Sequence, residues 1–234
     1  MDKQTLFAAL KGKLIVSCQA LEDEPLYDPE RSLMGHMALA AKRGGASGIR
    51  ANTVRDIEDI RRYVDLPIIG IIKRVFKDSD VYITPTMEEV DALVAAGVDI
   101  IATDATDRPR PNGVDFESFF RACRERYPQA VFMADCSNYE EGMRASRLGF
   151  DLVGTTMASY TPYTHGRALP DVEMIGALAR DAGVPVVAEG GIWTPEQLRS
   201  VFEAGAHTAV VGSAITRPML ITRRFAAVVP GAEG

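Results

Sequence analysis

Short apolar runs recur along the whole chain, and each is bounded by polar residues, glycine or proline. Most are rich in Val, Ile and Ala and too short for a helix, so they are typical of strands that are buried on both faces of a sheet. The eight runs lie at residues 14–19, 47–51, 68–73, 99–104, 131–135, 151–156, 185–190 and 208–212. The pattern therefore predicts eight short, buried strands.

The segments between these runs have the spacing of amphipathic helices, as in residues 87–97, where Val90, Leu93 and Val94 fall on one face. Capping boxes predict where helices begin, because a Ser or Thr and a Glu or Gln three residues later satisfy each other's backbone N–H groups. Glycine after the last turn predicts where helices end, because it adopts the left-handed conformation without strain. The predicted boxes pair Thr86 with Glu89, Ser137 with Glu140 and Thr194 with Gln197, and the terminal glycines are Gly97, Gly149, Gly183 and Gly205.

Strand and helix thus alternate along the chain, which indicates a repeated βα unit and a parallel sheet covered by helices. Eight units within 234 residues predict an α/β protein with a closed (β/α)8 barrel, a TIM barrel, as a single domain over residues 1–234. The alternative is a doubly wound open sheet, which usually has fewer strands. No GxGxxG sequence follows the first run, so nothing in the sequence favours dinucleotide binding.

Composition and charge restrict the possible partners. Apolar residues make up 47% of the chain and charged residues 25%, which is enough hydrophobic material for a full core. A net charge of -6 without a basic run argues against a nucleic-acid partner. No apolar stretch approaches the roughly 18 residues of a membrane span, and the start of the chain lacks the pattern of a signal peptide. We therefore expect a cytoplasmic protein without a membrane partner.

Cysteine and histidine are too scattered to predict a metal site. Cys18, Cys123 and Cys136 form no CxxC pair, and we expect Cys18 and Cys136 to pack as small apolar groups in a reducing compartment. The histidines lie far apart, without HxH or HExxH spacing, and His165 is expected to make a polar loop contact. The sequence therefore predicts no metal site.

The last polar residues of the predicted strands share a place in the fold. In a closed barrel the carboxyl ends of all strands face one mouth, where such barrels carry their catalytic groups. Any one of these residues alone would be interpreted as a solvated strand end, but together they predict a functional ring. The ring comprises Gln19, Arg50, Lys73, Asp104, Asp135, Thr155 or Thr156, Glu189, Gly212 and Ser213.

Lys73 and Glu189 lie at the ends of the third and seventh predicted strands, which are opposite each other in an eight-stranded barrel. They can therefore approach a substrate from two sides, as a reaction requires that removes a proton from one face of a carbon and returns one to the other. Burial or a neighbouring cation would lower the pKa of Lys73, and apolar surroundings would raise the pKa of Glu189. The alternative is a structural Lys–Glu ion pair across the mouth.

Glycines after the last two strands predict a phosphate site, because barrels of this type bind phosphate there through backbone N–H groups. Ordinary turn glycines are the alternative explanation of either pair alone. The predicted phosphate contacts are Gly190, Gly191, Gly212, Ser213 and Arg217. Two long loops, 103–113 and 158–170, complete the pattern, and we expect the second to fold over the site as a lid.

Nine segments occur in a characteristic order and spacing: VSCQALEDEPL, GIRAN, IKR, DVYITPT, ATDRPRPNG, MADCS, DLVGTT, AEGGIWTPEQ and VVGSAITRP. Together they cover nearly the whole chain and resemble the N-acetylmannosamine-6-phosphate 2-epimerases of bacterial sialic-acid catabolism. The resemblance implies a cofactor-free (β/α)8 isomerase that interconverts N-acetylmannosamine 6-phosphate and N-acetylglucosamine 6-phosphate. It also implies a homodimer whose small-molecule partner is an amino-sugar phosphate.

Carried over by position, the resemblance makes Lys73 and Glu189 the catalytic pair and places Arg217 near the phosphate. Ser213 departs from the family pattern, which often has Gly at this position. Two other function classes remain open, a lyase or synthase that uses Lys73 as a Schiff-base amine and a sugar-phosphate binding protein without activity. The expected substrate contacts are Gln19, Arg50, Asp135 and Thr155.

Overall fold

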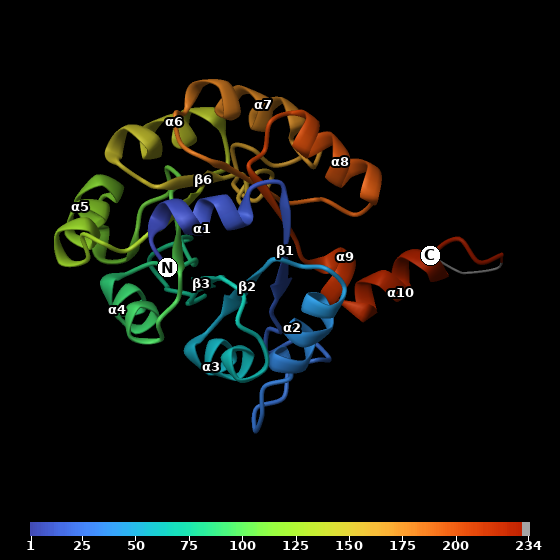
Figure 1. Cartoon of the computed structure of the whole chain (residues 1–234). Helices are drawn as coiled ribbons and strands as arrows, with labels where there is room; N and C mark the ends of the chain where they lie inside the picture. Colours follow the sequence, from blue (N-terminus) through green and yellow to red (C-terminus); the bar gives the residue numbers. More distant parts are fainter. Residues whose placement is uncertain (231–234) are drawn as a thin grey trace.

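Eight parallel strands form a closed barrel in the computed structural model, which describes residues 1–230. β8 pairs with β1 and closes the ring, and helices surround the barrel on the outside (Figure 1). The predicted barrel is confirmed, and the open sheet is wrong. Each predicted run contains one strand, with ends that agree within two residues: β1 (Lys13–Cys18), β2 (Gly48–Asn52), β3 (Ile68–Ile71), β4 (Ile100–Asp104), β5 (Phe132–Asp135), β6 (Leu152–Gly154), β7 (Val186–Glu189) and β8 (Thr208–Val211). The predicted domain of residues 1–234 includes residues 231–234, which lie outside the described part of the chain.

The helices cover the barrel wall, and a first helix lies across one end of it (Figure 1). They are α1 (Lys3–Leu10), α2 (Met34–Arg43), α3 (Val54–Tyr63), α4 (Met87–Ala95), α5 (Phe116–Arg126), α6 (Tyr139–Leu148), α7 (Val172–Asp181), α8 (Pro195–Glu203), α9 (Ser213–Thr216) and α10 (Pro218–Ala226), with a 3₁₀ turn at Pro111–Gly113. Leu6 and Leu10 of α1 are buried in one cluster with Ile15, Ile69 and other residues of the barrel interior. α1 therefore closes the amino-terminal end of the barrel and leaves the carboxyl ends of the strands as the open mouth. Within residues 1–230, no helix is long and apolar enough to cross a bilayer.

Most helix ends follow the predicted local chemistry. α4 and α8 begin with the predicted capping boxes. In each box the Thr side chain accepts from a backbone N–H of the first turn, and the Glu or Gln side chain accepts from the backbone N–H of the Thr. The predicted terminal glycines all have φ values between 67° and 106°, in the left-handed region that favours glycine. The capping boxes pair Thr86 with Glu89 and Thr194 with Gln197, and the terminal glycines are Gly97, Gly149, Gly183 and Gly205.

The predicted capping box of Ser137 and Glu140 is wrong by one residue. Asn138 caps α6, because its Oδ1 accepts from the N–H of Glu141 at 2.9 Å. The carboxylate of Glu141 in turn accepts from the N–H of Ser137 at 2.6 Å. Asn is as good an N-cap as Ser, so the helix begins one residue later than the sequence pattern suggests. The shift buries Glu141 and leaves Glu140 exposed.

α10 extends away from the barrel at the carboxyl end of the described chain (Figure 1). None of its residues is buried, and Phe225 exposes 72% of its surface. Val228 and Val229, which follow α10, are also exposed. This helix therefore presents apolar side chains that the barrel does not cover.

Candidate active site

A cavity of about 1130 Å³ opens at the carboxyl ends of the barrel strands. Its walls come chiefly from the segments that follow β1, β2, β3, β6, β7 and β8. Nine of the eleven predicted site residues line it: Gln19, Arg50, Lys73, Glu189, Gly190, Gly191, Gly212, Ser213 and Arg217. The other two, Asp135 and Thr155, lie behind this surface, with exposed fractions of 0% and 1%.

Arg50, Asp135 and Glu189 form an ion network beneath the cavity. Arg50 donates from Nη2 to Asp135 Oδ2 at 2.7 Å and from Nη1 to Asp135 Oδ1 at 3.1 Å. The same Nη1 donates to Glu189 Oε2 at 2.9 Å. A bidentate pair between two buried side chains fixes both in orientation. Glu189 thus pairs with Arg50, and within residues 1–230 no ion pair joins it to Lys73, so the structural alternative for that pair does not form.

The pKa values of Lys73 and Glu189 are displaced toward each other. Burial raises the pKa of Glu189 to about 7, against the opposing charge of Arg50 and with support from the charge of Asp135. Burial lowers the pKa of Lys73 to about 8, and the charges of Arg50 and Arg217 act in the same direction. Near neutral pH both groups can therefore gain and lose a proton, which is what general acid–base catalysis requires.

A short hairpin after β3 positions Lys73. Its backbone N–H donates to Asn52 Oδ1 at 2.8 Å, and it forms an isolated antiparallel bridge with Ile83. Asn52 also lines the cavity, and sequence reasoning missed it. The missing signal was strand alternation, because Asn52 lies two residues beyond Arg50 and therefore faces the same side of the sheet.

Gln19 presents an unused acceptor in the cavity wall. Its Nε2 donates to Ser17 Oγ at 2.7 Å, and within residues 1–230 its Oε1 is buried without a hydrogen-bond partner. A buried carbonyl oxygen is costly unless a ligand or water satisfies it. This arrangement fits the expected role of Gln19 as a substrate contact. Ser17, which also lines the cavity, was missed although it lies on the same strand face.

Thr155 and Thr156 follow β6 and point to different partners. The Thr155 hydroxyl donates to the backbone oxygen of Glu189 at 2.9 Å and accepts from its N–H at 3.1 Å. The Thr156 hydroxyl lines the cavity, 2.5 Å from Asp135 Oδ1 and 3.3 Å from Glu189 Oε2. Thr155 therefore holds the backbone of β7, whereas Thr156 contacts the carboxylates.

The two glycines after β7 allow the chain to turn tightly at the cavity wall. Gly190 and Gly191 have φ values of 108° and 68°. A Cβ on Gly191 would lie 2.1 Å from Leu169 Cβ, so no other residue fits there. Gly190 and Gly191 both line the cavity, so the backbone of this turn forms part of its wall.

Arg217 connects the predicted phosphate contacts with the loop after β1. Its Nη2 lies 2.6 Å from Glu24 Oε1, and its Nη1 donates to Ser213 Oγ at 3.3 Å. Its side chain is 27% exposed, so the ion pair with Glu24 is accessible to solvent. An anion bound beside Gly212 and Ser213 would compete with Glu24 for this guanidinium group.

Asp104 belongs to the predicted ring but does not reach the cavity surface. It is 1% exposed and pairs with Arg108 at 2.5 Å. The Arg108 guanidinium lies 5.8 Å from the centre of the Tyr82 ring, and Tyr82 lines the cavity. Burial raises the pKa of Tyr82 to about 12, so its hydroxyl keeps its proton. No local pattern in the sequence pointed to Tyr82, because it lies in an irregular hairpin.

The remaining predictions concern the loops and cysteines. The predicted lid segment contributes Tyr160 and Leu169 to the cavity wall, whereas His165 is exposed. Cys18 and Cys136 are buried in the main apolar cluster, as predicted, and burial raises the pKa of the Cys18 thiol to about 12. Closure of the lid stays a prediction.

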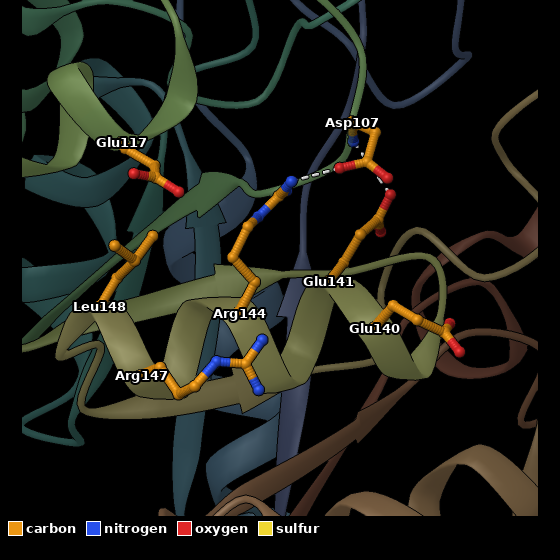
Figure 2. A pocket seen from close by; sticks show the side chains of 7 residues that line it. All are labelled: Asp107, Glu117, Glu140, Glu141, Arg144, Arg147 and Leu148. Atoms are coloured by element: carbon orange, nitrogen blue, oxygen red, sulfur yellow. Dashed lines mark hydrogen bonds and ion pairs between the residues drawn. The ribbon is translucent and has the colours of Figure 1, made fainter.

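A smaller hollow of about 400 Å³ lies on the outer surface between α5, α6 and the loop after β4. Figure 2 shows Arg144 of α6 reaching toward Asp107, with which it forms an ion pair. Glu141 points to the same loop, and its Oε1 accepts from the N–H of Asp107 at 2.9 Å. Both contacts hold the loop after β4 against α6, so the hollow lies at a structural junction between this loop and the helix.

Within residues 1–230, no group of three or more His, Cys, Asp or Glu side chains is arranged to hold a metal ion.

Comparison with known proteins identifies the family. A family model described as "Putative N-acetylmannosamine-6-phosphate epimerase" matches residues 34–230. The chain belongs to this epimerase family. The matched span contains Arg50, Lys73 and Glu189, and the resemblance carried by the nine segments is confirmed.

Relatives of the epimerase family align along almost the full chain. A protein of Clostridioides difficile (strain 630), named "Putative N-acetylmannosamine-6-phosphate 2-epimerase", is 52% identical over 216 residues, covering 92% of this chain and 95% of that protein. A protein of the same name from Enterobacter sp. (strain 638) is 52% identical over 228 residues, covering 97% and 96%. The solved N-acetylmannosamine-6-phosphate 2-epimerase from Clostridium perfringens superposes with a TM-score of 0.90 at 48% identity and covers 96% of each chain.

Proposed function

We propose that this protein interconverts N-acetylmannosamine 6-phosphate and N-acetylglucosamine 6-phosphate without a cofactor, by proton transfer at C2. The observation that carries the proposal is the placement of Lys73 just after β3 and of Glu189 at the end of the opposed strand β7, with pKa values of about 8 and about 7. The named relatives at about half identity support the substrate class.

The proposed chemistry begins once the sugar ring opens to an aldehyde, because the C2–H bond next to the carbonyl then becomes acidic. One residue of the pair removes the C2 proton, and the electron pair of the C–H bond forms an enolate with the C1 carbonyl oxygen. The other residue donates a proton to the opposite face of C2, so configuration inverts. The pair starts with one proton and ends with one, now on the other residue. Arg50, held by Asp135, supplies positive charge near the developing enolate.

Phosphate recognition is proposed at Gly190, Gly191, Gly212, Ser213 and Arg217. The exposed backbone of the two turns supplies N–H donors, and Arg217 adds a charge. Arg217→Ala should raise KM for the phosphorylated sugar by about tenfold or more, since a charge-assisted hydrogen bond contributes about 1.5–3 kcal/mol. KM and kcat that both stay at the wild-type value would remove Arg217 from the site.

The protein is further proposed to be a cytoplasmic homodimer, in which a second copy covers the apolar side chains of α10. The support is the exposure of Phe225 at 72%, together with Val228 and Val229. Sedimentation should give a dimer for the wild type and a shift toward monomer for Phe225→Glu. A monomeric wild type at micromolar concentration would contradict the dimer.

The test of the proposed function is turnover in D2O, followed by proton NMR. Purified protein with N-acetylmannosamine 6-phosphate should form the epimer with deuterium at C2, and EDTA should leave the rate intact. Product whose C2 keeps its original hydrogen throughout would contradict proton exchange with the pair. Borohydride trapping of substrate on Lys73 would instead favour a Schiff-base lyase, and binding without turnover would favour a sugar-phosphate binding protein.

A further inference from the structure

Thr156 occupies a position that the proposed mechanism does not yet use. The chain on either side of it is held by two strands: the N–H of Thr155 donates to Val187 O at 3.2 Å, and the N–H of Met157 donates to Cys136 O at 3.0 Å. Thr156 is therefore fixed between the ends of β5 and β7. Its side chain points between the carboxylates at those two strand ends.

The hydroxyl of Thr156 completes a closed cycle of hydrogen bonds with Asp135, Arg50 and Glu189. Its Oγ1 lies 2.5 Å from Asp135 Oδ1 and 3.3 Å from Glu189 Oε2. The two carboxylate oxygens are joined on their other side by Arg50 Nη1, at 3.1 Å and 2.9 Å. A hydroxyl has one hydrogen to donate and lone pairs to accept, so it cannot donate fully to both carboxylates.

We infer that Thr156 is a positioning residue for Glu189, whose hydroxyl turns between the two carboxylates as Glu189 gains and loses its proton. The contact of 2.5 Å to Asp135, against 3.3 Å to Glu189, fits the state in which Glu189 is protonated and the hydroxyl donates to Asp135. When Glu189 is ionised, the hydroxyl turns and donates to Glu189. Once Glu189 is protonated, the carboxyl group donates to Thr156 Oγ1, and the hydroxyl hydrogen turns to Asp135. No covalent bond changes at Thr156, and Asp135 remains paired with Arg50 in both states.

A hydroxyl suits this place because an acid–base residue must be held in both protonation states during each turnover. Arg50 can only donate, so it favours the ionised form of Glu189 alone. The other charged groups facing Glu189 are Lys73, from the segment after β3, and Asp135, from β5. Thr156 is the neutral member of this set, and it can serve as donor or acceptor.

The inference rests on the proposed role of Glu189 in proton transfer, but its first test does not need turnover. Glutamate labelled with ¹³C at the side-chain carboxyl reports the titration of Glu189 in the full-length protein, assigned by the signal that Glu189→Gln removes. Thr156→Val removes one bond from the ionised state, the donation to Glu189. It removes two bonds from the protonated state, the donation of the Glu189 carboxyl to Oγ1 and the donation of the hydroxyl to Asp135. The protonated state therefore loses more, and the pKa of Glu189 should fall, by about half a unit to one unit.

Two further variants separate this role from packing. Thr156→Ser keeps the hydroxyl and should restore the wild-type titration midpoint. Thr155→Val is the matched control, because it removes a neighbouring hydroxyl that bonds only the backbone of Glu189. It should lower the thermal midpoint and leave the titration of Glu189 in place.

The outcomes separate the proposed role of Thr156 from the proposed epimerase activity. A Glu189 midpoint that stays fixed in folded Thr156→Val, or that moves equally in Thr156→Ser, would overturn the inference even if the enzyme turns over. If the titration midpoint of Glu189 shifts only in Thr156→Val and the wild type has no epimerase activity, the result would support the role of the Thr156 hydroxyl and contradict the proposed function. In active Thr156→Val protein, the acidic limb of kcat/KM should move to lower pH together with the NMR midpoint.

Discussion

Glu141 and Glu189 are both buried carboxylates at the carboxyl-terminal end of the barrel, but their surroundings differ in the number of donors. Glu141 is 1% exposed and accepts from four groups: Ser137 N at 2.6 Å, Ser137 Oγ at 2.8 Å, Asp107 N at 2.9 Å and Tyr163 Oη at 2.6 Å. Glu189 is 14% exposed and has Arg50 and Thr156 at its Oε2. Within residues 1–230, no donor reaches its Oε1.

The difference separates a structural carboxylate from a reactive one. An ionised carboxylate has about four lone-pair sites, and donors fill those of Glu141. It joins the loops that follow β4, β5 and β6, and Figure 2 shows it beneath the loop that carries Asp107. Glu189 keeps one oxygen without a protein donor, next to a cavity, and burial raises its pKa to about 7. Burial with few donors therefore prepares a carboxylate for proton transfer, whereas burial with many donors fixes a loop.

The largest expected effect comes from Glu189→Gln. This change keeps size and removes the acid–base function, so kcat should fall by about 10²–10⁴-fold. Circular dichroism and the thermal midpoint should show that the barrel remains folded. A loss in kcat of less than tenfold would indicate that Glu189 is a structural carboxylate like Glu141, and would contradict the proposed difference between them.

Glu141→Gln should act mainly on stability. The amide cannot accept from all four donors, and buried N–H and O–H groups left unpaired cost about 1–3 kcal/mol each. We expect the free energy of unfolding to fall by at least that amount in urea titration, with kcat reduced far less than in Glu189→Gln. A kcat loss as large as that of Glu189→Gln, in protein shown to be folded, would contradict the structural role.

Tyr163→Phe sharpens the comparison by removing one donor of Glu141. The expected loss in the free energy of unfolding is about 1 kcal/mol, because the other three donors remain. Since Tyr163 lies in the same loop as Tyr160, which lines the cavity, KM should rise more than kcat falls. Kinetics that change only in kcat would argue against an effect through loop position.

The barrel itself was predictable from the sequence because its signals are local. Short apolar runs and glycines after helices indicate the βα unit directly, and the eight repeats are enough to close a barrel. The capping box of α6 was misplaced because Ser137 and Asn138 are both good N-caps, and only the buried donors at Glu141 decide between them.

The site was predictable in part, because the ends of the strands are predictable but the pairings across the barrel are not. Arg50 and Glu189 lie 139 residues apart, and their contact depends on the closure and tilt of the whole sheet. Thr155 and Thr156 could not be told apart, since β6 ends at Gly154 and strand alternation stops there. Tyr82 lies in a hairpin without regular periodicity.

The pH dependence of kcat/KM tests the central claim most directly, because it reports the protonation of the free enzyme. Below the pKa of Glu189, about 7, both Glu189 and Lys73 carry a proton, and above the pKa of Lys73, about 8, both have lost it. Only the form with one proton on the pair reacts in either direction, so the account predicts a narrow bell with limbs near these two values. Glu141→Gln should keep both limbs, whereas the residual activity of Glu189→Gln should lose the acidic one. An acidic limb that survives in Glu189→Gln, or a wild-type profile that stays flat from about pH 6 to about pH 9, would contradict the assignment of Glu189 as the reactive carboxylate.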